Sequence, residues 1–450
     1  MKGTGLRPSP KTTPAPRPPG SAPDLAYGLD DLPSWPRSLI YGFQWGIIFL
    51  PTLVILSSIS TEYLGLGGGE KVLFFQKILI LSGAIMVLQT LWGHRYPLLD
   101  GPSSALLLSF IILASHGMPA IQGGMIAGGV FLIGLSAFRL VRHLEPLFTD
   151  NVIGVILILI AVTLLPYLAP MIIGAQPGSP SGDPVVFGVS LTVMVGIALF
   201  SHWLSGFPKT ISLILGIILG TMLMGVLGRL RMGAVWEASW FTIPHPLFST
   251  YPKFSISATV TFLLAYVAVI INAVGSIYSV GEVVGKRDLS RRVARGIGLT
   301  GLGGLFAGAL GVIGTVSYGI SPGVVLVTRV GTRFALTVCG AFLVILAFFQ
   351  KFLTLVSSIP VSVVGAAMIT GMAAQVGAGI SVLARSERPL EGRDYLVIGI
   401  PILMGGIISI LPEGFFQAFP FLAHALLKNG LVVGIVLVLV LEHLMLPRKK

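Results

Sequence analysis

Polar side chains that could contact a solute are rare inside the apolar stretches of this 450-residue sequence. Gln44, Asn272 and Ser276 stand out, because amide and hydroxyl groups can donate and accept hydrogen bonds. Gln89 and Gln375 also lie in apolar runs, where hydrogen bonding between helices is the more common role. The chemistry that these groups offer is recognition of a small polar molecule rather than bond cleavage.

Sequence motifs for nucleophilic, zinc-dependent or nucleotide-driven chemistry are missing. The sequence has no G-x-S-x-G, no H-E-x-x-H and no G-x-x-x-x-G-K-[ST]. Its 7 His are scattered, and its single cysteine, Cys339, excludes a disulfide within the chain. We therefore expect no enzyme, no catalytic residue, no metal site and no cofactor.

The composition predicts a protein that is embedded in a lipid bilayer. Hydrophobic residues make up 54% of the sequence, charged residues 10%, and the mean hydropathy is +0.92. Soluble domains carry about 25% charged residues, so this chain could not cover a surface exposed to water. The net charge of +12 is spread over short clusters between apolar runs, a pattern set by membrane topology. We expect lipid and a small solute as partners, and no nucleic acid.

The apolar runs divide into candidate membrane segments, with an odd number in each half. The first half holds 38–59, 72–93, 103–115, 120–141, 152–173, 184–204 and 210–228, and the second half holds 256–284, 293–312, 321–330, 334–356, 360–376, 395–411 and 430–446. We predict an all-α polytopic membrane protein with about 14 transmembrane segments. Because the number per half is odd, the second half enters the membrane inverted relative to the first, as in transporters built from inverted repeats.

These runs also predict the domain boundaries and the topology. The predicted parts are a disordered cytoplasmic tail at 1–35, a first repeat at 38–228, an interfacial connector at 229–255, a second repeat at 256–446 and a C-terminal tail at 447–450. With the N-terminus inside and every segment counted as a crossing, 22 of the 29 Lys and Arg residues fall on the cytoplasmic side. We therefore predict a multi-pass protein of the cell (plasma) membrane with both termini in the cytoplasm.

Two of the segments, 103–115 and 321–330, are too short to span a bilayer. Each is the third segment of its half, and each follows an extended-looking stretch, at 96–99 and at 315–319. Both open with Gly, Pro and Ser, and proline favours the first turn of a helix. We predict two half-helices that begin in mid-membrane, where free N–H groups and the helix dipole form a pocket for a solute. The alternative is a pair of tight Gly-Pro turns between packed helices.

The residues that open these segments resemble the nucleobase–ascorbate transporter family, which includes uracil and xanthine permeases. The resemblance runs over about residues 27–446. The matching stretches are Gln44-Trp45 for a Gln-His pair, Gly101-Pro102-Ser103-Ser104-Ala105 for G-P-S-x-A, Gly323 to Arg329 for G-x4-T followed by a basic residue, and 358–365 for S-I-P-x-P-V-x-G. The family implies a seven-plus-seven inverted repeat with core and gate domains, and transport of nucleobases by alternating access, coupled to protons or sodium. Relatives are often dimers, so a homodimer is expected.

The resemblance also implies which residues bind the solute. They are Gln44, Ser103, Ser104, Ala105, Asn272, Ser276, Ile320, Ser321 and Gly323. Two positions depart from the family, since Asn272 stands where a Glu usually bonds the base and Ile320 where a Gln or Glu opens the tenth-segment signature. Neither residue can titrate, which argues against proton coupling through these positions. Asp100 and Asp150 lie near segment ends, where a cap or loop role is expected.

Two other functions stay open. Without acids at those two positions, the helix N-termini are the main electrostatic feature, which favours a small-anion transporter on the same fold. The second alternative is a membrane receptor or scaffold that transports nothing.

Overall fold

The computed structural model describes residues 25–447 except 139, 141–146, 148, 176–180, 206–207, 209–210, 231, 249, 286–287, 385–388, 417–418, 420–426 and 428. In this part of the chain, 9 helices are long and apolar enough to cross a membrane. Shorter apolar helices and two half-helices complete the membrane segments. The predicted class, an all-α polytopic membrane protein, is confirmed.

The helices follow the predicted order in both halves. The first half contains α1 (Trp35–Tyr63), α2 (Gly68–Leu91), α3 (Ser104–Ile112), α4 (Met118–Ala137), α6 (Asp150–Ile173), α7 (Pro184–Trp203) and α9 (Ser212–Val226). The second half contains α11 (Ile256–Val284), α12 (Leu289–Leu310), α13 (Ser321–Thr328), α14 (Arg333–Leu346), α16 (Val361–Ala384), α17 (Gly392–Ile410) and α20 (Gly430–Val440), which continues into a π-helix (Leu441–Met445). Short elements between them are a 3-10 turn (Ala114–His116), α10 (Gly233–Glu237), α15 (Gln350–Ser357) and α18 (Glu413–Phe416).

Helix packing in the first half is mirrored in the second. Helix α4 packs against α12 as α14 packs against α2, and α1 packs on α14 as α11 packs on α4. In the same way α7 pairs with α9, and α17 pairs with α20. In each case, replacing both helices of a pair by the helices at the same positions in the other half gives the second pair. The predicted seven-plus-seven inverted repeat is therefore confirmed.

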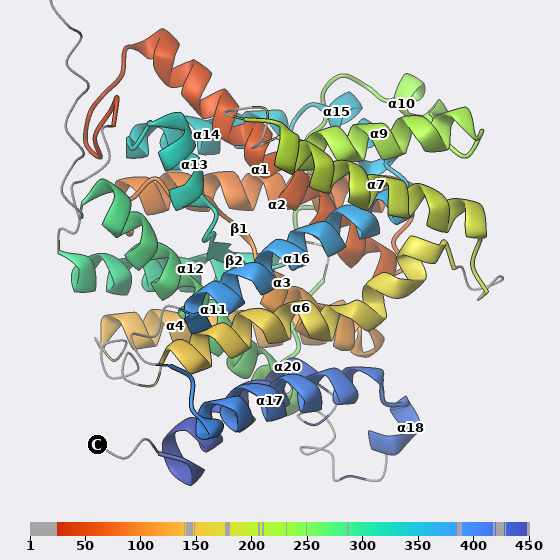
Figure 1. Ribbon diagram of the computed structural model, residues 1–450. Coiled ribbons are helices and arrows are strands. Elements are labelled where there is room, and N and C mark those ends of the chain that lie inside the picture. The colour runs from red at the N-terminus through yellow and green to blue at the C-terminus, as the bar shows by residue number, and fades with distance from the viewer. Residues whose placement is uncertain are drawn as a thin grey trace, which may run out of the picture.

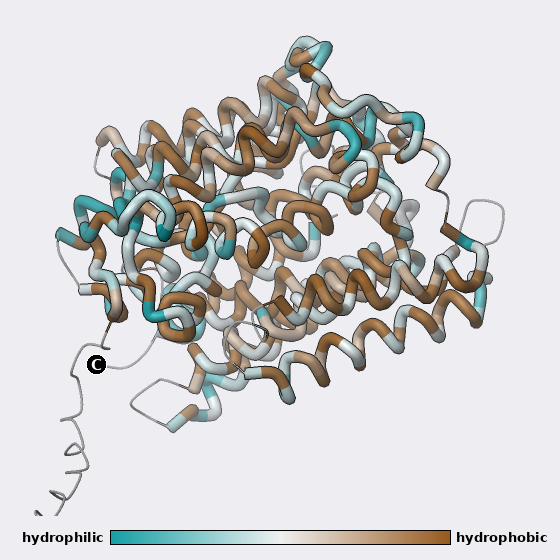
Figure 2. Tube along the Cα trace, turned by 90° about the horizontal axis from the view of Figure 1, so that it is seen from above, coloured by the Kyte–Doolittle hydropathy of each residue, from teal (hydrophilic) through white to brown (hydrophobic). Residues whose placement is uncertain are grey.

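The helices form two groups. The core group contains α1 to α4 and α11 to α14, and the gate group contains α6, α7, α9, α16, α17 and α20. Figure 1 shows the gate helices as a row that runs from α9 and α7 through α16 and α6 to α20 and α17. Apolar residues run along most of the helices, and hydrophilic residues gather toward their ends (Figure 2). This distribution matches a bundle whose middle lies in hydrocarbon.

Pairs of glycines set the closest crossings in the core. A Cβ atom on Gly129 of α4 would lie 2.6 Å from the carbonyl oxygen of Gly301 on α12, and one on Gly301 would lie 2.7 Å from that of Gly129. The mirror crossing of α2 and α14 is built the same way, with corresponding distances of 2.5 and 2.6 Å between Gly83 and Gly340. Small residues let membrane helices approach closely, so both halves use one packing solution.

The connector changes one predicted segment. The range 334–356 is not one span, because α14 ends at Leu346 and α15 begins after a break. In the break, Phe349 pairs with Phe241 of the connector, and the N–H of Thr242 donates to the carbonyl oxygen of Phe348 at 2.9 Å. Backbone bonds to the connector therefore replace the helical bonds that would have continued α14.

Residues 25–34 lie along the start of α14. The N–H of Ala26 donates to the carbonyl oxygen of Arg329 at 2.8 Å, and Arg333 Nε donates to Asp30 Oδ1 at 2.8 Å. The predicted tail boundary at residue 35 is therefore placed too late, and the rest of that tail, 1–24, lies outside the described residues, as do 448–450. The other domain divisions, 38–228, 229–255 and 256–446, stay predictions.

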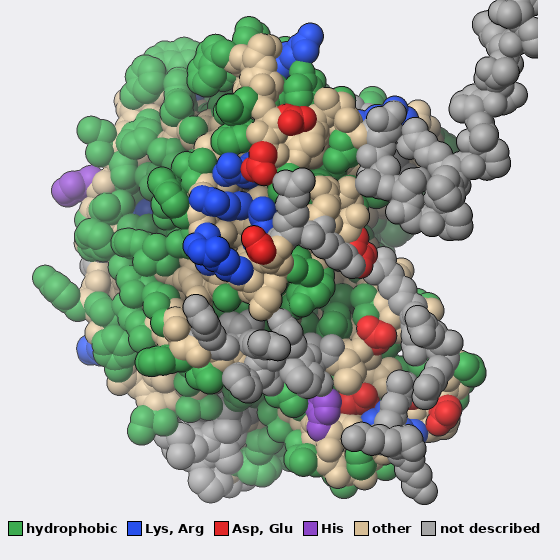
Figure 3. Space-filling view, turned by 90° about the vertical axis from the view of Figure 1, so that its left-hand side faces the viewer, with side chains coloured by type: hydrophobic (Ala, Val, Ile, Leu, Met, Phe, Trp, Pro, Cys, Tyr) green, Lys and Arg blue, Asp and Glu red, His purple; other side chains and the backbone are tan. Residues whose placement is uncertain are grey.

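Basic side chains gather on the face where α1 begins (Figure 3). The first two turns of α12 contribute Arg291, Arg292 and Arg295 to this end of the bundle. An excess of Lys and Arg at one end of the bundle is typical of membrane proteins, whose cytoplasmic loops are enriched in these residues. Which side of the membrane this face meets stays a prediction.

We expect Gly129→Ala to lower the thermal unfolding temperature of the purified protein in detergent. The new Cβ would lie 2.5 Å from the backbone nitrogen of Leu305 and 2.6 Å from the carbonyl oxygen of Gly301, so α12 would have to move. Such overpacking costs about 1–3 kcal/mol. Gly134→Ala on the same helix is the control, because nothing lies within 4 Å of its Cβ. Equal unfolding temperatures for the two variants would contradict the tight crossing.

Candidate functional site

A two-stranded antiparallel sheet holds the half-helices at the centre of the core. Strand β1 (Asp100–Pro102) leads into α3, and β2 (Thr315–Ser317) leads into α13. Both strands are completely buried and lie between the core helices (Figure 1). The predicted extended stretch at 96–99 lies a few residues too early, because pairing with β2 begins only at Asp100. The second stretch, 315–319, contains its strand.

Further backbone bonds join the start of each half-helix to the opposite strand segment. The N–H of Ser103 donates to the carbonyl oxygen of Gly314 at 2.8 Å, and the N–H of Tyr318 donates to that of Leu99 at 2.8 Å. The N–H of Leu99 donates to Ser321 Oγ at 3.0 Å. The prediction that the two interrupted segments meet is confirmed, and the tight-turn alternative is wrong because their backbones pair with each other.

The two half-helix ends differ in how they are capped. Ser103 Oγ accepts the N–H of Leu106 at 3.5 Å and so caps α3. At α13 the preceding residue is Ile320, and no side chain among the described residues caps this end. Ile320 is 49% exposed, and a Cβ on Gly323 would meet nothing within 4 Å. The partial positive charge of α13 therefore faces space that the described protein atoms do not fill.

Helix α11 brings the predicted polar pair beside β2. Ser276 is buried and its Oγ donates to the carbonyl oxygen of Ser317 at 3.1 Å. The same hydroxyl lies 3.5 Å from Asn272 Oδ1. Asn272 is half-buried, and a Cβ on the neighbouring Gly275 would meet nothing within 4 Å. Asn272 thus lies on a partly open face of α11, which also packs against α13.

The remaining predicted residues offer fewer polar groups to a solute at the half-helix ends. Ser321 and Ala105 are buried, and Ser104 is half-buried. On α1 the ring of Phe49, rather than Gln44, fills the contact with β1 and lies 5.4 Å from the ring of Tyr318. Gln44 is five residues earlier, about 140° around the helix, so it points in another direction. The structure joins Asn272 and Ser276 to the half-helices, and on α1 it is Phe49 that contacts β1.

The charged part of this region is not among the residues predicted from the sequence. Asp100 is 1% exposed, and its expected cap or loop role is wrong because strand pairing buries it. Its Oδ1 accepts the hydroxyl of Ser317 at 2.7 Å, and its Oδ2 lies 3.1 Å from His94 Nε2. Asp150 is the first residue of α6, and the cap of that helix is Thr149, whose side chain accepts the N–H of Val152. The sequence carried a weak signal, since Asp100 directly precedes the Gly-Pro-Ser cluster, but nothing in it indicated a partner.

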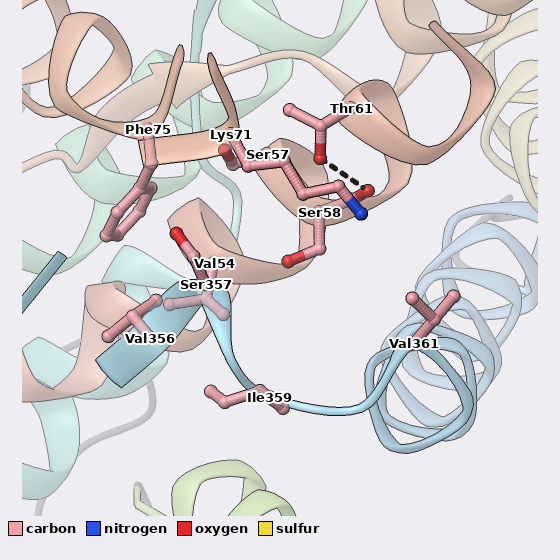
Figure 4. A pocket seen from close by; sticks show the side chains of 10 residues that line it. All are labelled: Val54, Ser57, Ser58, Thr61, Lys71, Phe75, Val356, Ser357, Ile359 and Val361. Atoms are coloured by element: carbon pink, nitrogen blue, oxygen red, sulfur yellow. Dashed lines mark hydrogen bonds between the residues drawn. The ribbon is translucent and has the colours of Figure 1, made fainter. Parts of the chain in front are cut away.

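One described cavity lies away from the half-helices, and Figure 4 shows its lining. It is formed by the second half of α1, including Val54 and Thr61, by Lys71 of α2, and by Val361 at the start of α16. Its volume of about 20 Å³ is room for roughly one water molecule. A heterocyclic solute does not fit there, so this cavity is not the binding site.

Comparison with known proteins identifies relatives over nearly the whole chain. A family model described as "Permease family" (Xan_ur_permease) matches residues 36–414. Nucleobase transporter PlUacP of Paenibacillus larvae is 26% identical over 422 residues, which cover 92% of this chain and 96% of that protein. Uric acid transporter UacT of Escherichia coli (strain K12) is 26% identical over 422 residues, which cover 92% and 87%. Among solved structures, the transmembrane domain of the cyanobacterium bicarbonate transporter BicA matches with a TM-score of 0.64 at 15% identity, covering 83% of this chain and 95% of that one, and shares the fold.

Ser321→Ala tests the contact between the half-helices. The substitution removes the oxygen that accepts the buried N–H of Leu99, and leaving such a group unpaired costs about 1–3 kcal/mol. We expect a lower thermal unfolding temperature in detergent. Ser381→Ala is the control, because that exposed hydroxyl bonds only the Gly377 carbonyl of its own helix. A Ser321→Ala protein as stable as the control would show that this bond does not hold α13 in place.

Proposed function

We propose, because this chain belongs to the nucleobase–ascorbate transporter family of permeases, that it carries an oxopurine anion such as urate across the membrane. As a member of that family it is a multi-pass membrane transporter of a small molecule and not an enzyme. The observation that carries the proposed substrate is the uncapped start of α13, which faces open space beside the neutral amide of Asn272.

Electrostatics at this end favour a negative solute. A helix N-terminus carries about half an elementary positive charge, and a low-dielectric surround strengthens its field. Neither Asn272 nor Ile320 brings a carboxylate that would cancel it. The buried Asp100 directs its oxygens to Ser317 and His94. Uric acid is a monoanion at neutral pH, whereas uracil and hypoxanthine are neutral, so the end of α13 discriminates in favour of urate.

Shape and hydrogen bonding favour a planar heterocycle over an inorganic anion. The amide of Asn272 offers one acceptor and two donors, which suits the alternating carbonyl and N–H groups along a purine edge. Gly275 and Gly323 have no Cβ, and atoms added there would meet nothing within 4 Å. These two glycines leave room for the edge of a planar ring beside the Asn272 amide and the start of α13.

Alternating access requires the core and the gate to separate at one end at a time. At the end where α1 finishes, the hydroxyl of Tyr63 donates to the carbonyl oxygen of Tyr167 on α6, and their rings lie 5.5 Å apart. Near the same end Asn429 Nδ2 donates to Ser109 Oγ of α3 at 3.4 Å. These contacts join core to gate, and they support a state in which the solute reaches α13 from the opposite end, where α1 begins.

Flux measurements test the substrate class. Purified protein in proteoliposomes that are loaded with unlabelled urate should exchange it for labelled urate, and excess xanthine should compete. Excess bicarbonate, chloride or sulfate should not compete, because these ions lack a purine edge. Competition by inorganic anions together with no exchange of any purine would favour the small-anion alternative. Absence of every flux would favour the receptor or scaffold.

Charge at position 272 tests the binding mode. In Asn272→Asp a carboxylate faces the bound anion, and two like charges about 4 Å apart repel by about 4 kcal/mol near a protein surface. We expect the KM for urate to rise at least about tenfold, with a smaller change for neutral hypoxanthine. Asn272→Gln keeps the amide and is the matched control. A loss of equal size for urate and hypoxanthine would contradict the proposed recognition of an anion.

A further inference from the structure

Three acidic side chains are buried in the described part of the chain. Asp394 and Glu442 lie together in the gate, where guanidinium nitrogens of Arg393 are 2.9 Å from a carboxylate oxygen of each. Asp100 lies in the core, 1% exposed, and its hydrogen-bond partners are an imidazole and a hydroxyl. Among the described residues no Lys or Arg forms an ion pair with it. A buried charge without a fixed counter-charge is costly, so this carboxylate is suited to exchange a proton.

The hydrogen bonds around His94 fix where its proton lies. His94 Nδ1 is 3.0 Å from the backbone nitrogen of Tyr96, and because that N–H can only donate, Nδ1 is the acceptor. The ring proton is then on Nε2, which donates to Asp100 Oδ2 at 3.1 Å. The imidazole is therefore neutral in this arrangement, and the His94–Asp100 pair carries one net negative charge.

We propose that the His94–Asp100 pair binds a proton that this transporter couples to movement of its solute. The proposal rests on the transport function proposed above. It assigns the titrating role to a carboxylate in the strand pair, since the two positions that face the solute, Asn272 and Ile320, cannot take up a proton.

The fate of that proton follows from the hydrogen bonds. His94 Nδ1 already accepts from Tyr96, so an added proton enters the carboxylate of Asp100 and the pair becomes neutral. When the proton is on Oδ1, Ser317 Oγ, which donates to the charged carboxylate, has to become the acceptor. The proton is taken from water on one side of the membrane and returned to water on the other, so nothing is oxidised or reduced.

A short path links this pair to the proposed solute site. Ser317 belongs to β2, and its carbonyl oxygen accepts the hydroxyl of Ser276 at 3.1 Å. That hydroxyl also lies 3.5 Å from Asn272 Oδ1. The Ser317 hydroxyl that reverses therefore belongs to the residue whose carbonyl oxygen accepts from Ser276, and Ser276 in turn contacts the amide of Asn272. Charge on Asp100 and occupancy of the solute site are coupled through β2.

Other charged and titratable groups surround the pair without neutralising it. Arg292 of α12 directs its guanidinium at the carbonyl oxygens of His94 and Arg95, at 2.9 and 2.8 Å, and lies over the ring of Tyr96 at 4.5 Å. Directly after β2, the phenol of Tyr318 donates to the carbonyl oxygen of Pro102. Gln89 of α2 and Thr300 of α12 are neutral neighbours, and Gln89 Nε2 donates to Thr300 Oγ1 at 3.2 Å. Arg292 and the adjacent Arg95, whose Nε donates to the carbonyl oxygen of Leu91 at 2.8 Å, thus direct donors at backbone carbonyls.

Infrared spectroscopy tests proton binding without any solute. In purified full-length protein, lowering the pH should produce a protonated-carboxyl band that is missing in Asp100→Asn. Asp394→Asn is the matched control, a buried carboxylate of the gate, and should keep the band. Removing the hydroxyl in Ser317→Ala should change the pH at which the band appears, because the hydrogen bond from Ser317 to the carboxylate is lost. A band that persists in Asp100→Asn, or no titrating band in the wild type, would overturn the proposal.

Transport assays test the coupling. Wild-type proteoliposomes should accumulate labelled urate under an inward pH gradient, whereas Asp100→Asn should lose accumulation and its urate exchange should no longer vary with pH. Accumulation driven by a sodium gradient and indifferent to pH would overturn the proposal. If thermal unfolding shows that Asp100→Asn does not fold, the infrared band of Ser317→Ala tests the proton site instead. A band that appears at the same pH as in the wild type would then overturn the proposal. If wild-type protein exchanges no purine, the proposed substrate fails, while the infrared result still judges the proton site.

Discussion

Backbone groups that leave a helix inside a bilayer must find partners within the protein, because hydrocarbon offers none and each unpaired group costs several kcal/mol. In this permease the three-residue pairing of β1 and β2 meets that need for both interrupted segments at once. The half-helices, the buried carboxylate and the exposed end of α13 all take their positions from this pairing. Without it, a polar opening in mid-membrane would have no stable form.

The inverted repeat makes the two halves alike in packing and unlike in chemistry. Glycine pairs at mirrored crossings bring α4 to α12 and α2 to α14, so a helix of each half packs closely against a helix of the other half on both sides of the strands. The half-helix ends differ, because Ser103 covers the amides of α3 with its own oxygen whereas Ile320 leaves those of α13 uncapped. A symmetric scaffold therefore presents one electropositive end, and a solute has one preferred place to bind.

Much of the fold could be predicted from the sequence, because long apolar runs and odd segment numbers are local signals. The half-helices were also accessible, since Gly, Pro and Ser open both of them. The bond between Asp100 and Ser317 joins residues 217 positions apart, and no local pattern predicts such a contact. The break before α15 depends on the connector, and the contact of α1 with β1 depends on which helix face carries Phe49. These features follow from tertiary packing, which periodicity alone does not reveal.

The strand pairing also sets the order of events during biosynthesis. When the ribosome has delivered Asp100 and its neighbours to the membrane, their partner strand has not yet been made. At translation rates of about 5–20 residues per second, a separation of 217 positions takes roughly 10–40 s to synthesise. During that interval the nascent third segment needs shelter from lipid, either at the insertion machinery or near the water interface. The first half therefore completes the core of its fold only after β2 of the second half has been made.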